Sequence, residues 1–525
     1  MATAPNKSDR WILISILVLA SAVFSGALWQ QRKVSAVHLD DAYITFRYAE
    51  NLARGKGFVY NQGQHLLGTT TPLFCLLLTV FRLLGLSPTI SADLINLLSA
   101  VFSAVLVFLI CKENRLRLVG VGAVILFIFF PFFWFNLASG METMFTIFLA
   151  LLFIWLDLKN MPVCAGLISG FLLLTRIDTL SVFAAVFLVR FFKNRKLAMI
   201  MVSSCIVTLL PWVVFATAYF GSPIPHSLFS KKITHPVRSI LILKYDYIYW
   251  FLGLSHWLFS LSPNNSSEKI YLPILTFFAF LGAVRSATKE HWALVFVLWI
   301  IFYIAGITLG QTYSFYWYPI PMLSGYLILT SLGIKWLFQL ALKKKETLAR
   351  VLNFLVVISL VGLWVRRYDQ TAMEMIASHE RAYVFIAEKI KETLKPGDLV
   401  FVGEVGIIGY TLLGYHIIDG DGLISPEVYE ILKQDRQKLI RIDPAYRWQW
   451  WGSPEYIRTV IDKYHPRYVV NSLDLHHMKE LVADPEFQKK YQPITVLKLG
   501  PSVFIACQRR DEQGPDAETY KDINK

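Results

Sequence analysis

Apolar runs of nearly membrane-spanning length recur along the first two thirds of this chain. A transmembrane helix needs about 20 largely apolar residues. The eleven runs that approach this length cover about residues 11–29, 90–111, 118–136, 143–157, 161–175, 179–192, 197–220, 269–285, 291–309, 319–342 and 349–365. Hydrophobic residues make up 55% of the chain and charged residues only 17%, which excludes an ordinary soluble protein. The sequence therefore predicts a polytopic α-helical membrane protein with about eleven transmembrane helices and additional interfacial helices.

The charged residues divide the chain into two parts. Residues 1–365 hold 29 Lys and Arg against 13 Asp and Glu, whereas residues 366–525 hold 22 against 24. The net charge of +14 therefore belongs to the apolar part, where basic residues at helix ends set orientation, and we exclude nucleic acid as a partner. We expect a transmembrane domain over residues 1–365 and an extracytoplasmic domain over residues 366–525.

The basic clusters between the apolar runs predict the orientation of the chain. If the eleven runs alternate, these clusters share one side: Lys112, Arg115 and Arg117, Lys159, residues 193–196, Arg285 and Lys289, and residues 343–345. Lys and Arg are enriched on the cytoplasmic side, so the N-terminus is expected there and the C-terminal domain outside. The apolar stretch 72–84 is too short to span a membrane. We interpret it, with the aromatic stretch 240–262, as interfacial or re-entrant helix on the outer side.

The C-terminal part alternates helical patterns with short apolar strands, which is typical of a small α/β layer fold. The helical patterns cover Met373–Leu394, Pro454–Tyr464 and Leu475–Val482, and the strands cover Leu399–Val402, Tyr468–Val470, Thr495–Leu497 and Val503–Cys507.

Acidic residues are rare in the membrane part, and those expected on its outer side are candidates for a common site. Asp40 and Asp41 directly follow the first apolar run and begin a helical pattern with Ile44, Tyr48 and Leu52 on one stripe. An interfacial helix fits this pattern. One aspartate alone could be a helix N-cap, but a pair exceeds what a cap needs. A carboxylate can deprotonate an acceptor hydroxyl or hold a metal ion, so the pair is the first catalytic candidate.

Two further outer loops carry charge. Glu142 lies beside a Ser-Gly turn, where it could serve as an N-cap or face a ligand. Arg176 and Asp178 lie at the outer end of two short runs, where they could form a mutual ion pair. Arg176 could instead hold a lipid phosphate.

The loop at 220–232 carries His226, Lys231 and Lys232. Outer lysines oppose the usual charge bias, so they could neutralise a polyprenyl phosphate or diphosphate. Contact with lipid headgroups is the alternative. The aromatic residues at 313 and 315–318 are more typical of an interfacial belt than of a sugar platform.

Several segments resemble GT-C fold glycosyltransferases, and in particular their arabinofuranosyltransferase-like branch. The segments are LDDAYITFRYAENLARGKGFVYNQGQ (39–64), TTTPLF (69–74), SGMET (139–143), LTRID (174–178), GSPIPHSLFSKK (221–232) and GEVGIIGYTLLGYHIIDGDGLISPEV (403–428). Arg47 lies in the first of these and is a further candidate for substrate or phosphate binding. The chain departs from the branch at Ile177, where Pro is usual, and at His226, where Asn is usual.

The resemblance implies an inverting transfer of a sugar from a polyprenyl-phosphate donor to a glycan, lipid or protein acceptor outside a bacterial cytoplasmic membrane. It implies that a first-loop aspartate, Asp40 or Asp41, is the general base, and that Arg176 and Lys231 are the stronger phosphate ligands. The same aspartates would hold a divalent cation, Mg²⁺ or Mn²⁺, if one is used.

Two alternatives stay open at this stage. One is a membrane-anchored binding or assembly protein, for which the carboxylate pair would be dispensable, and the other is a transporter. A lipid or sugar transporter or flippase would have a similar number of helices, although it should carry ionisable residues near the bilayer midplane. The chain has no P-loop, and the glycines of 403–409 lack the spacing of a dinucleotide-binding motif, in agreement with a donor activated by its own lipid. We interpret 403–409 as a packing element of the outer domain, with glycan binding as the alternative.

Overall fold

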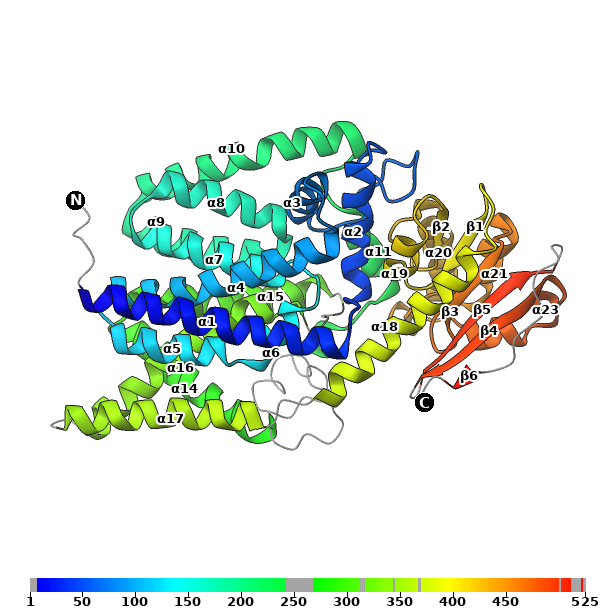
Figure 1. Ribbon diagram of the computed structural model, residues 1–525. Coiled ribbons are helices and arrows are strands. Elements are labelled where there is room, and N and C mark those ends of the chain that lie inside the picture. The colour runs from blue at the N-terminus through cyan, green and yellow to red at the C-terminus, as the bar shows by residue number, and fades with distance from the viewer. Residues whose placement is uncertain are drawn as a thin grey trace.

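The computed structural model describes residues 7–241, 268–366 and 370–522, apart from positions 312, 314, 316, 343, 344, 449, 500, 501 and 511–520. A helical half and a half built around a β-sheet lie next to each other (Figure 1). This confirms the expected combination of a polytopic helical part and a C-terminal α/β part.

All eleven apolar runs form helices. They are α1 (Lys7–Val34), α4 (Pro88–Glu113), the pair α5 (Arg117–Ile128) and α6 (Pro131–Leu137), α7 (Thr143–Leu158), α8 (Pro162–Thr175), α9 (Leu180–Lys193), α10 (Arg195–Phe220), α14 (Glu268–Thr288), α15 (Leu294–Gly310), α16 (Ile320–Ala341) and α17 (Glu346–Arg366). Within the described residues, six helices are long and apolar enough to cross a membrane, or seven if the pair α5–α6, bent by 55°, is one span. The chain is thus a multi-pass membrane protein, and the number of eleven spans stays a prediction.

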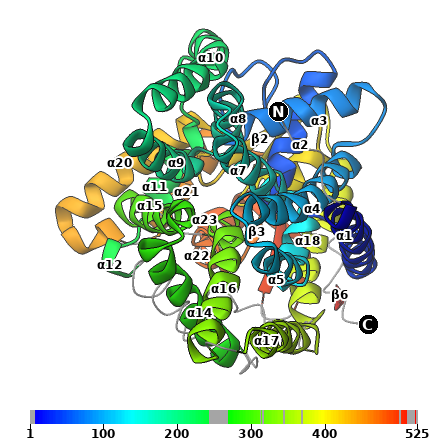
Figure 2. The same ribbon diagram turned by 90° about the vertical axis from the view of Figure 1, so that its left-hand side faces the viewer.

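The helices of this bundle differ in how much of their surface the protein covers. The apolar segment of α16 is 83% buried, whereas those of α10 and α17 are only 17% buried. Figure 2 shows the bundle nearly end-on, with α10 and α17 at its periphery. Small residues let α16 approach its neighbour α14 closely, because a Cβ at Gly333 would overlap the backbone carbonyl of Phe278. Thus α16 is central, and α10 and α17 present apolar surface to lipid.

Ion pairs gather several of the predicted cytoplasmic basic residues at one end of the bundle. Asp9 in α1 pairs with Lys112 at 3.2 Å and with Arg117 at 3.1 Å, and Lys159 pairs with Glu113 at 2.7 Å. Figure 1 shows the N-terminal end of α1 at the end of the bundle opposite the sheet. These basic residues therefore share one side, as expected from their alternation.

Short helices fill the space between the bundle and the sheet. They are α2 (Asp40–Ala53), α3 (Pro72–Leu83), α11 (His226–Thr234) and α12 (Ser239–Leu241). In Figure 1, α2 runs across the axes of the bundle helices. The expected helix after Asp40 is present, and nine of its fourteen residues are buried. Its position at the membrane interface stays a prediction. Residues 242–262 of the predicted aromatic interfacial stretch lie outside the described residues.

The sheet half contains a mixed six-stranded sheet with the order β2-β1-β3-β5-β4-β6. Its strands are β1 (Leu399–Val402), β2 (His416–Asp419), β3 (Tyr468–Ser472), β4 (Tyr491–Leu499), β5 (Ser502–Arg509) and β6 (Lys521–Asp522). β1 pairs in parallel with β2 and β3, and β5 runs antiparallel to β3 and β4. The four predicted strands are present. β2 was not predicted, because a four-residue strand with polar residues at both ends gives little periodic signal.

Helices cover both faces of the sheet and connect it to the bundle. They are α18 (Gln370–Lys391), α19 (Gly406–Thr411), α20 (Pro426–Ile442), α21 (Pro454–Tyr464), α22 (Met478–Ala483) and α23 (Pro485–Lys490). One apolar core joins Phe46 of α2 with Ile407 of α19 and Ile386 of α18. A separate core lies between the sheet and α20, α21 and α22. The sheet half is therefore attached to the helical half by a continuous hydrophobic core, which fixes the site between them.

Candidate functional site

A cavity of about 170 Å³ lies at the end of the bundle that faces the sheet. Five of the residues singled out in the sequence line it, although they come from separate segments of the chain. They are Asp41, Glu142, Arg176, Asp178 and Lys231. The structure therefore brings together most of the predicted site.

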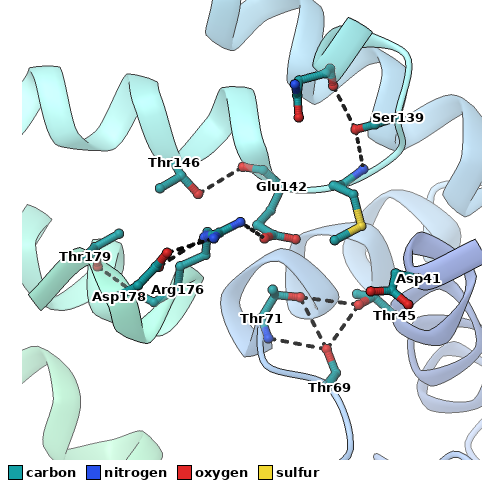
Figure 3. Close-up of polar contacts among 12 residues, drawn as sticks. Asp41, Thr45, Thr69, Thr71, Ser139, Glu142, Thr146, Arg176, Asp178 and Thr179 are labelled. Atoms are coloured by element: carbon teal, nitrogen blue, oxygen red, sulfur yellow. Dashed lines mark hydrogen bonds and ion pairs between the residues drawn. The ribbon is translucent and has the colours of Figure 1, made fainter. Parts of the chain in front are cut away.

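Arg176 is held between two carboxylates in this cavity. α8 ends at Thr175, and the extended backbone of Arg176 (φ −157°, ψ 130°) turns its side chain toward the start of α7. The guanidinium donates to both oxygens of Asp178, at 3.1 and 2.7 Å, and to Glu142 Oε1 at 3.2 Å, as Figure 3 shows. The predicted Arg176–Asp178 ion pair is confirmed. Glu142 precedes α7 but does not cap it with its side chain, so its carboxylate serves this cluster instead.

Three threonine hydroxyls form a second polar group in the same cavity. Thr45 Oγ1 lies 3.0 Å from Thr69 Oγ1 and 3.3 Å from Thr71 Oγ1, and the latter two are 3.2 Å apart. Figure 3 shows this triangle next to Asp41 and across the cavity from Glu142. All three threonines are buried. The cavity thus offers neutral hydroxyl groups as well as charged ones.

Asp41 and Lys231 face each other at one wall of the cavity. Lys231 Nζ lies 3.6 Å from Asp41 Oδ2 and 4.9 Å from the centre of the Phe315 ring. Burial alone would lower the pKa of Lys231, but Tyr318 and the Asp41 carboxylate raise it above its usual value, so the amine stays charged. Both side chains also line a second cavity, which lies between the two halves. A carboxylate and a cation therefore stand at the boundary of two cavities.

Asp40 has a different environment from its neighbour. Its two oxygens accept hydrogen bonds from the backbone N–H groups of Gly406 and Ile407, at 2.8 and 2.7 Å, at the start of α19. A Cβ at Gly406 would overlap the Asp40 carbonyl, so only glycine permits this approach. Gly406 therefore has the packing role that was expected of segment 403–409. Asp40 therefore does cap a helix, as the N-cap interpretation expected. The capped helix is α19 of the sheet half, which the sequence did not predict.

Three other candidate residues lie outside the cavities. Arg47 is 1% exposed, and it donates to the backbone carbonyls of Tyr60 and Gly409 and, at 2.7 Å, to that of Tyr415. Its prediction as a substrate ligand is wrong, because it connects α2 to the sheet half. His226 packs its ring against Tyr429, and Lys232 is exposed. Neither lines a described cavity, so both predictions of ligand contact find no support in the geometry.

The aromatic loop after α15 faces protein rather than lipid. Tyr313, Trp317 and Tyr318 line the first cavity, and Phe315 and Trp317 line the second. The belt interpretation is therefore wrong for these residues, and residue 316 lies outside the described set.

The Asp40–Asp41 pair does not fit a metal ion in this arrangement. Both oxygens of Asp40 are occupied by backbone N–H groups, and Asp41 faces a lysine amine. Across the described residues, no group of three or more His, Cys, Asp and Glu side chains is placed to hold a metal. We therefore assign no step to a metal ion.

Three buried carboxyl groups meet where the halves join, and they predict a pH dependence of stability. Burial and neighbouring acids raise the pKa values of Asp40 and Glu380 well above the usual range. Burial raises the pKa of Glu404 to about 7. Asp41 and Asp421 add to this increase, whereas Tyr383 and His476 oppose it. A raised pKa means that the folded protein binds the proton more tightly than the unfolded chain. The resulting stabilisation is complete below the ordinary pKa and is lost as pH rises through about 7.

We therefore expect the apparent Tm in detergent to fall between about pH 5 and pH 8. The Glu404→Gln variant should show a shallower fall, because the amide does not titrate. The apparent Tm of this variant should still fall to some extent with rising pH, since burial also raises the pKa of Asp419 to about 7. An apparent Tm that rises over this range in the wild type would contradict the prediction.

Sequence reasoning missed the residues that the sheet half contributes. Glu404, Asp421 and His476 line the second cavity, together with Glu380 of α18. Two signals were available. Glu404 and Asp421 lie in the segment 403–428 that resembles the family, and all three residues follow short strands, which becomes informative once the strand order is known.

Comparison with known proteins gives the fold. Residues 369–520 match a domain family of unknown function (DUF8728). None of the curated proteins matches the sequence. Among solved structures, the chain is similar to ArnT from Cupriavidus metallidurans bound to undecaprenyl phosphate, with a TM-score of 0.56 and 13% identity. That alignment covers 93% of this chain and 97% of ArnT.

The chain is also similar to an oligosaccharyltransferase from Archaeoglobus fulgidus. The structure of that protein with Zn and sulfate gives a TM-score of 0.53 at 12% identity, covering 92% of this chain and 72% of the other. The structure tethered to an acceptor peptide gives 0.55 at 13% identity, covering 94% and 73%. At such low identity the likeness concerns the fold. This multi-pass membrane protein therefore has the GT-C fold.

Proposed function

We propose that this protein is a membrane glycosyltransferase that moves a sugar from a polyprenyl-phosphate donor to an acceptor hydroxyl on a glycan, lipid or protein. The observation that carries the proposal is the pair Asp41 and Lys231, a carboxylate and a charged amine at the boundary of two cavities. Transfer from a phosphate-linked sugar requires these two groups: a base for the incoming hydroxyl and a cation for the leaving phosphate. The similarity to an ArnT structure that contains undecaprenyl phosphate supports this donor class.

We assign the role of general base to Asp41 rather than Asp40. The Asp41 carboxylate takes the proton of the acceptor hydroxyl as the hydroxyl oxygen attacks the anomeric carbon of the donor. The bond from that carbon to the phosphate oxygen breaks, and polyprenyl phosphate leaves with the electron pair. Attack opposite the leaving group inverts the anomeric configuration. Asp40 is excluded from this role because its oxygens already accept two backbone hydrogen bonds.

Lys231 is the main phosphate ligand in this proposal. Its amine lines both cavities and forms an ion pair with one carboxylate, Asp41, while Asp421 acts on it from further away. Arg176, the other predicted ligand, is already bound by Asp178 and Glu142, so it has less capacity for an additional anion. We assign that cluster and the threonine triangle to the sugar of the donor, whose hydroxyls can both donate and accept hydrogen bonds.

We further propose that the protein lies in a bacterial cytoplasmic membrane, with its N-terminus in the cytoplasm and the sheet half outside. The ion-paired basic residues at the end of the bundle opposite the sheet support this orientation. The arabinofuranosyltransferase-like branch stays a prediction from motifs.

The decisive experiment is an assay of the purified protein with a panel of polyprenyl-phosphate sugars and labelled acceptors. Formation of a labelled glycoside with release of polyprenyl phosphate is the expected result. The same preparation in liposomes tests the transporter alternative. Movement of labelled lipid across the bilayer without any glycoside product would replace the transferase proposal by a flippase.

The Lys231→Gln variant tests the phosphate contact. We expect transfer to fall by roughly 10²–10³-fold, because removal of a preorganised group that stabilises developing charge has this effect. The exposed neighbour provides a matched control, and Lys232→Gln should retain wild-type rates. Equal rates for both variants in a transfer assay would contradict the role of Lys231.

A further inference from the structure

The second cavity, with a volume of about 330 Å³, lies between the two halves of the molecule. It shares Asp41, Lys231, Trp317 and Leu423 with the first cavity. A ligand in the second cavity would therefore reach the same carboxylate and amine from the side of the sheet.

The strand order of the sheet supports ligand binding in this cavity. β1 lies between its parallel neighbours β2 and β3. The chain passes from β1 to β2 on one side and then crosses to β3 on the other, so the carboxyl ends of β1 and β3 form a topological switch point. Ligands of open α/β sheets bind in the crevice outside such strand ends. Glu404 follows β1, Asp421 follows β2 and His476 follows β3, and all three line the cavity.

Several of the polar groups at these strand ends are fixed in place. His476 Nε2 lies 2.7 Å from Asp421 Oδ1, and the Trp451 indole donates to the same oxygen at 3.1 Å. The other ring nitrogen of His476 lies 3.1 Å from Asn471 Nδ2. These bonds hold an aromatic ring and a carboxylate at the cavity wall before any ligand arrives, which lowers the entropic cost of binding.

Two other carboxyl groups each have an oxygen atom without a hydrogen-bond partner among the described residues. Glu380 lines the cavity and is 7% exposed, yet its Oε2 has no hydrogen-bond partner among the described residues. The buried Oε2 atom of Glu404 also lacks one within that set, as does the neighbouring Tyr383 hydroxyl, which lowers the pKa of Glu404. Buried polar atoms are rarely left unpaired, because each costs free energy. Groups that donate hydrogen bonds, such as ligand hydroxyls, would complete both.

The composition of the walls restricts the class of ligand. Aromatic rings of Phe315 and Trp317, stacked with centres 4.8 Å apart, and of Trp451 offer flat apolar surface. The described lining contains five carboxyl groups (Asp40, Asp41, Glu380, Glu404 and Asp421) but only one lysine amine. Asp41 and Asp421 repel an anion, and Asp40, Glu380 and Glu404, whose pKa values are raised, supply no positive charge that could bind one. A neutral sugar fits these walls. Its hydroxyl groups can donate hydrogen bonds to the carboxyl groups, and the apolar C–H groups on its faces can pack against the aromatic rings.

We propose that the second cavity binds the acceptor of the transfer as an uncharged polyhydroxyl group, the end of a glycan, and presents one of its hydroxyls to Asp41. This assignment of the acceptor class rests on the proposed function. It gives the sheet half a direct role in substrate recognition.

A binding measurement tests the cavity without requiring turnover. Methyl pentosides and hexosides, and the matching sugar phosphates, are titrated against the full-length protein in detergent, and tryptophan fluorescence is recorded. We expect a saturable change with neutral glycosides that is smaller in Trp451→Phe, because Trp317 still lines the cavity. Sugar phosphates should bind at least about tenfold more weakly.

Glu404→Ala and Glu380→Ala should each weaken glycoside binding by about tenfold, because each removes a hydrogen-bond acceptor. Glu388→Ala is the matched control, since Glu388 is an exposed glutamate on the same helix as Glu380. If an alanine variant does not fold, Glu404→Gln keeps an oxygen acceptor of similar size and should bind within about threefold of the wild type. Unchanged binding in both alanine variants would overturn the assignment.

The transfer assay separates this inference from the function it rests on. Efficient transfer to neutral glycosides, with a raised acceptor KM and an unchanged donor KM in Glu404→Ala, is the expected result. Preferred transfer to phosphorylated acceptors overturns the acceptor class and leaves the transferase intact. If no sugar is transferred from any donor, the proposed function fails, and the fluorescence titration alone decides whether the cavity binds sugars.

Discussion

Replacing Asp41 by Asn is expected to lower kcat for sugar transfer by about 10²–10⁴-fold, the range that positioned general bases contribute. The amide cannot take a proton from the acceptor hydroxyl. It has nearly the same shape as the carboxylate, and Asp41 is 28% exposed with a single ion pair to Lys231. The apparent Tm should therefore stay close to that of the wild type. Initial rates at saturating donor and acceptor, measured together with thermal denaturation in detergent, provide both quantities.

Asp40→Asn is the matched control, because it makes the same chemical change one residue away. Its amide can accept only one of the two backbone hydrogen bonds at the start of α19, and its N–H₂ group would face the other N–H. We expect a lower apparent Tm and a smaller loss of kcat in the fraction that stays folded. A large loss of kcat in Asp40→Asn at unchanged Tm, with an active Asp41→Asn protein, would reverse the assignment of the base.

Arg47→Met should produce the largest loss of stability in this part of the molecule. The guanidinium donates to backbone carbonyls of both halves and to Asn61, and it stacks at 4.3 Å from the centre of the Tyr60 ring. Methionine fills part of the volume but leaves several buried acceptors unpaired. Each unpaired group costs about 1–3 kcal/mol, so a loss of at least about 4 kcal/mol is expected.

Because Arg47 connects the two halves, limited proteolysis offers a second readout. The sheet half should be cut faster in Arg47→Met than in the wild type, because it separates from the helical half more often. Lys56→Met is a suitable control, since Lys56 is exposed beyond the end of α2. Wild-type Tm and wild-type proteolysis in Arg47→Met would show that the apolar core alone holds the halves together.

The helical half could be predicted from the sequence because membrane spans leave a strong local signal. Every expected apolar run forms a helix, and a run such as 197–220 in α10 is recognisable from length and hydropathy alone. Strands predicted in the sheet half, such as Leu399–Val402, followed from short apolar patterns. β2 and α20 could not be predicted from such patterns, because the pattern of apolar residues in each depends on which neighbouring elements bury it.

The candidate site was predictable only in part. Glu142, Arg176 and Lys231 were found because charged residues are conspicuous next to apolar runs, and they do meet in one cavity. Arg47 was misassigned for the same reason, since a buried arginine in a matching motif gives no indication that its partners are backbone carbonyls more than 360 residues away in sequence.

The sequence by itself determined that this is a polytopic helical membrane protein with an α/β part at its end, because hydropathy and periodicity are local properties. Only the tertiary structure distinguished the surroundings of Asp40 from those of Asp41. Successive residues on an α-helix point about 100° apart, so one carboxylate caps α19 and the other faces both cavities. Only the strand order could show that Glu404, Asp421 and His476 line one wall, since residues that follow parallel strands become neighbours through the sheet and not through the chain.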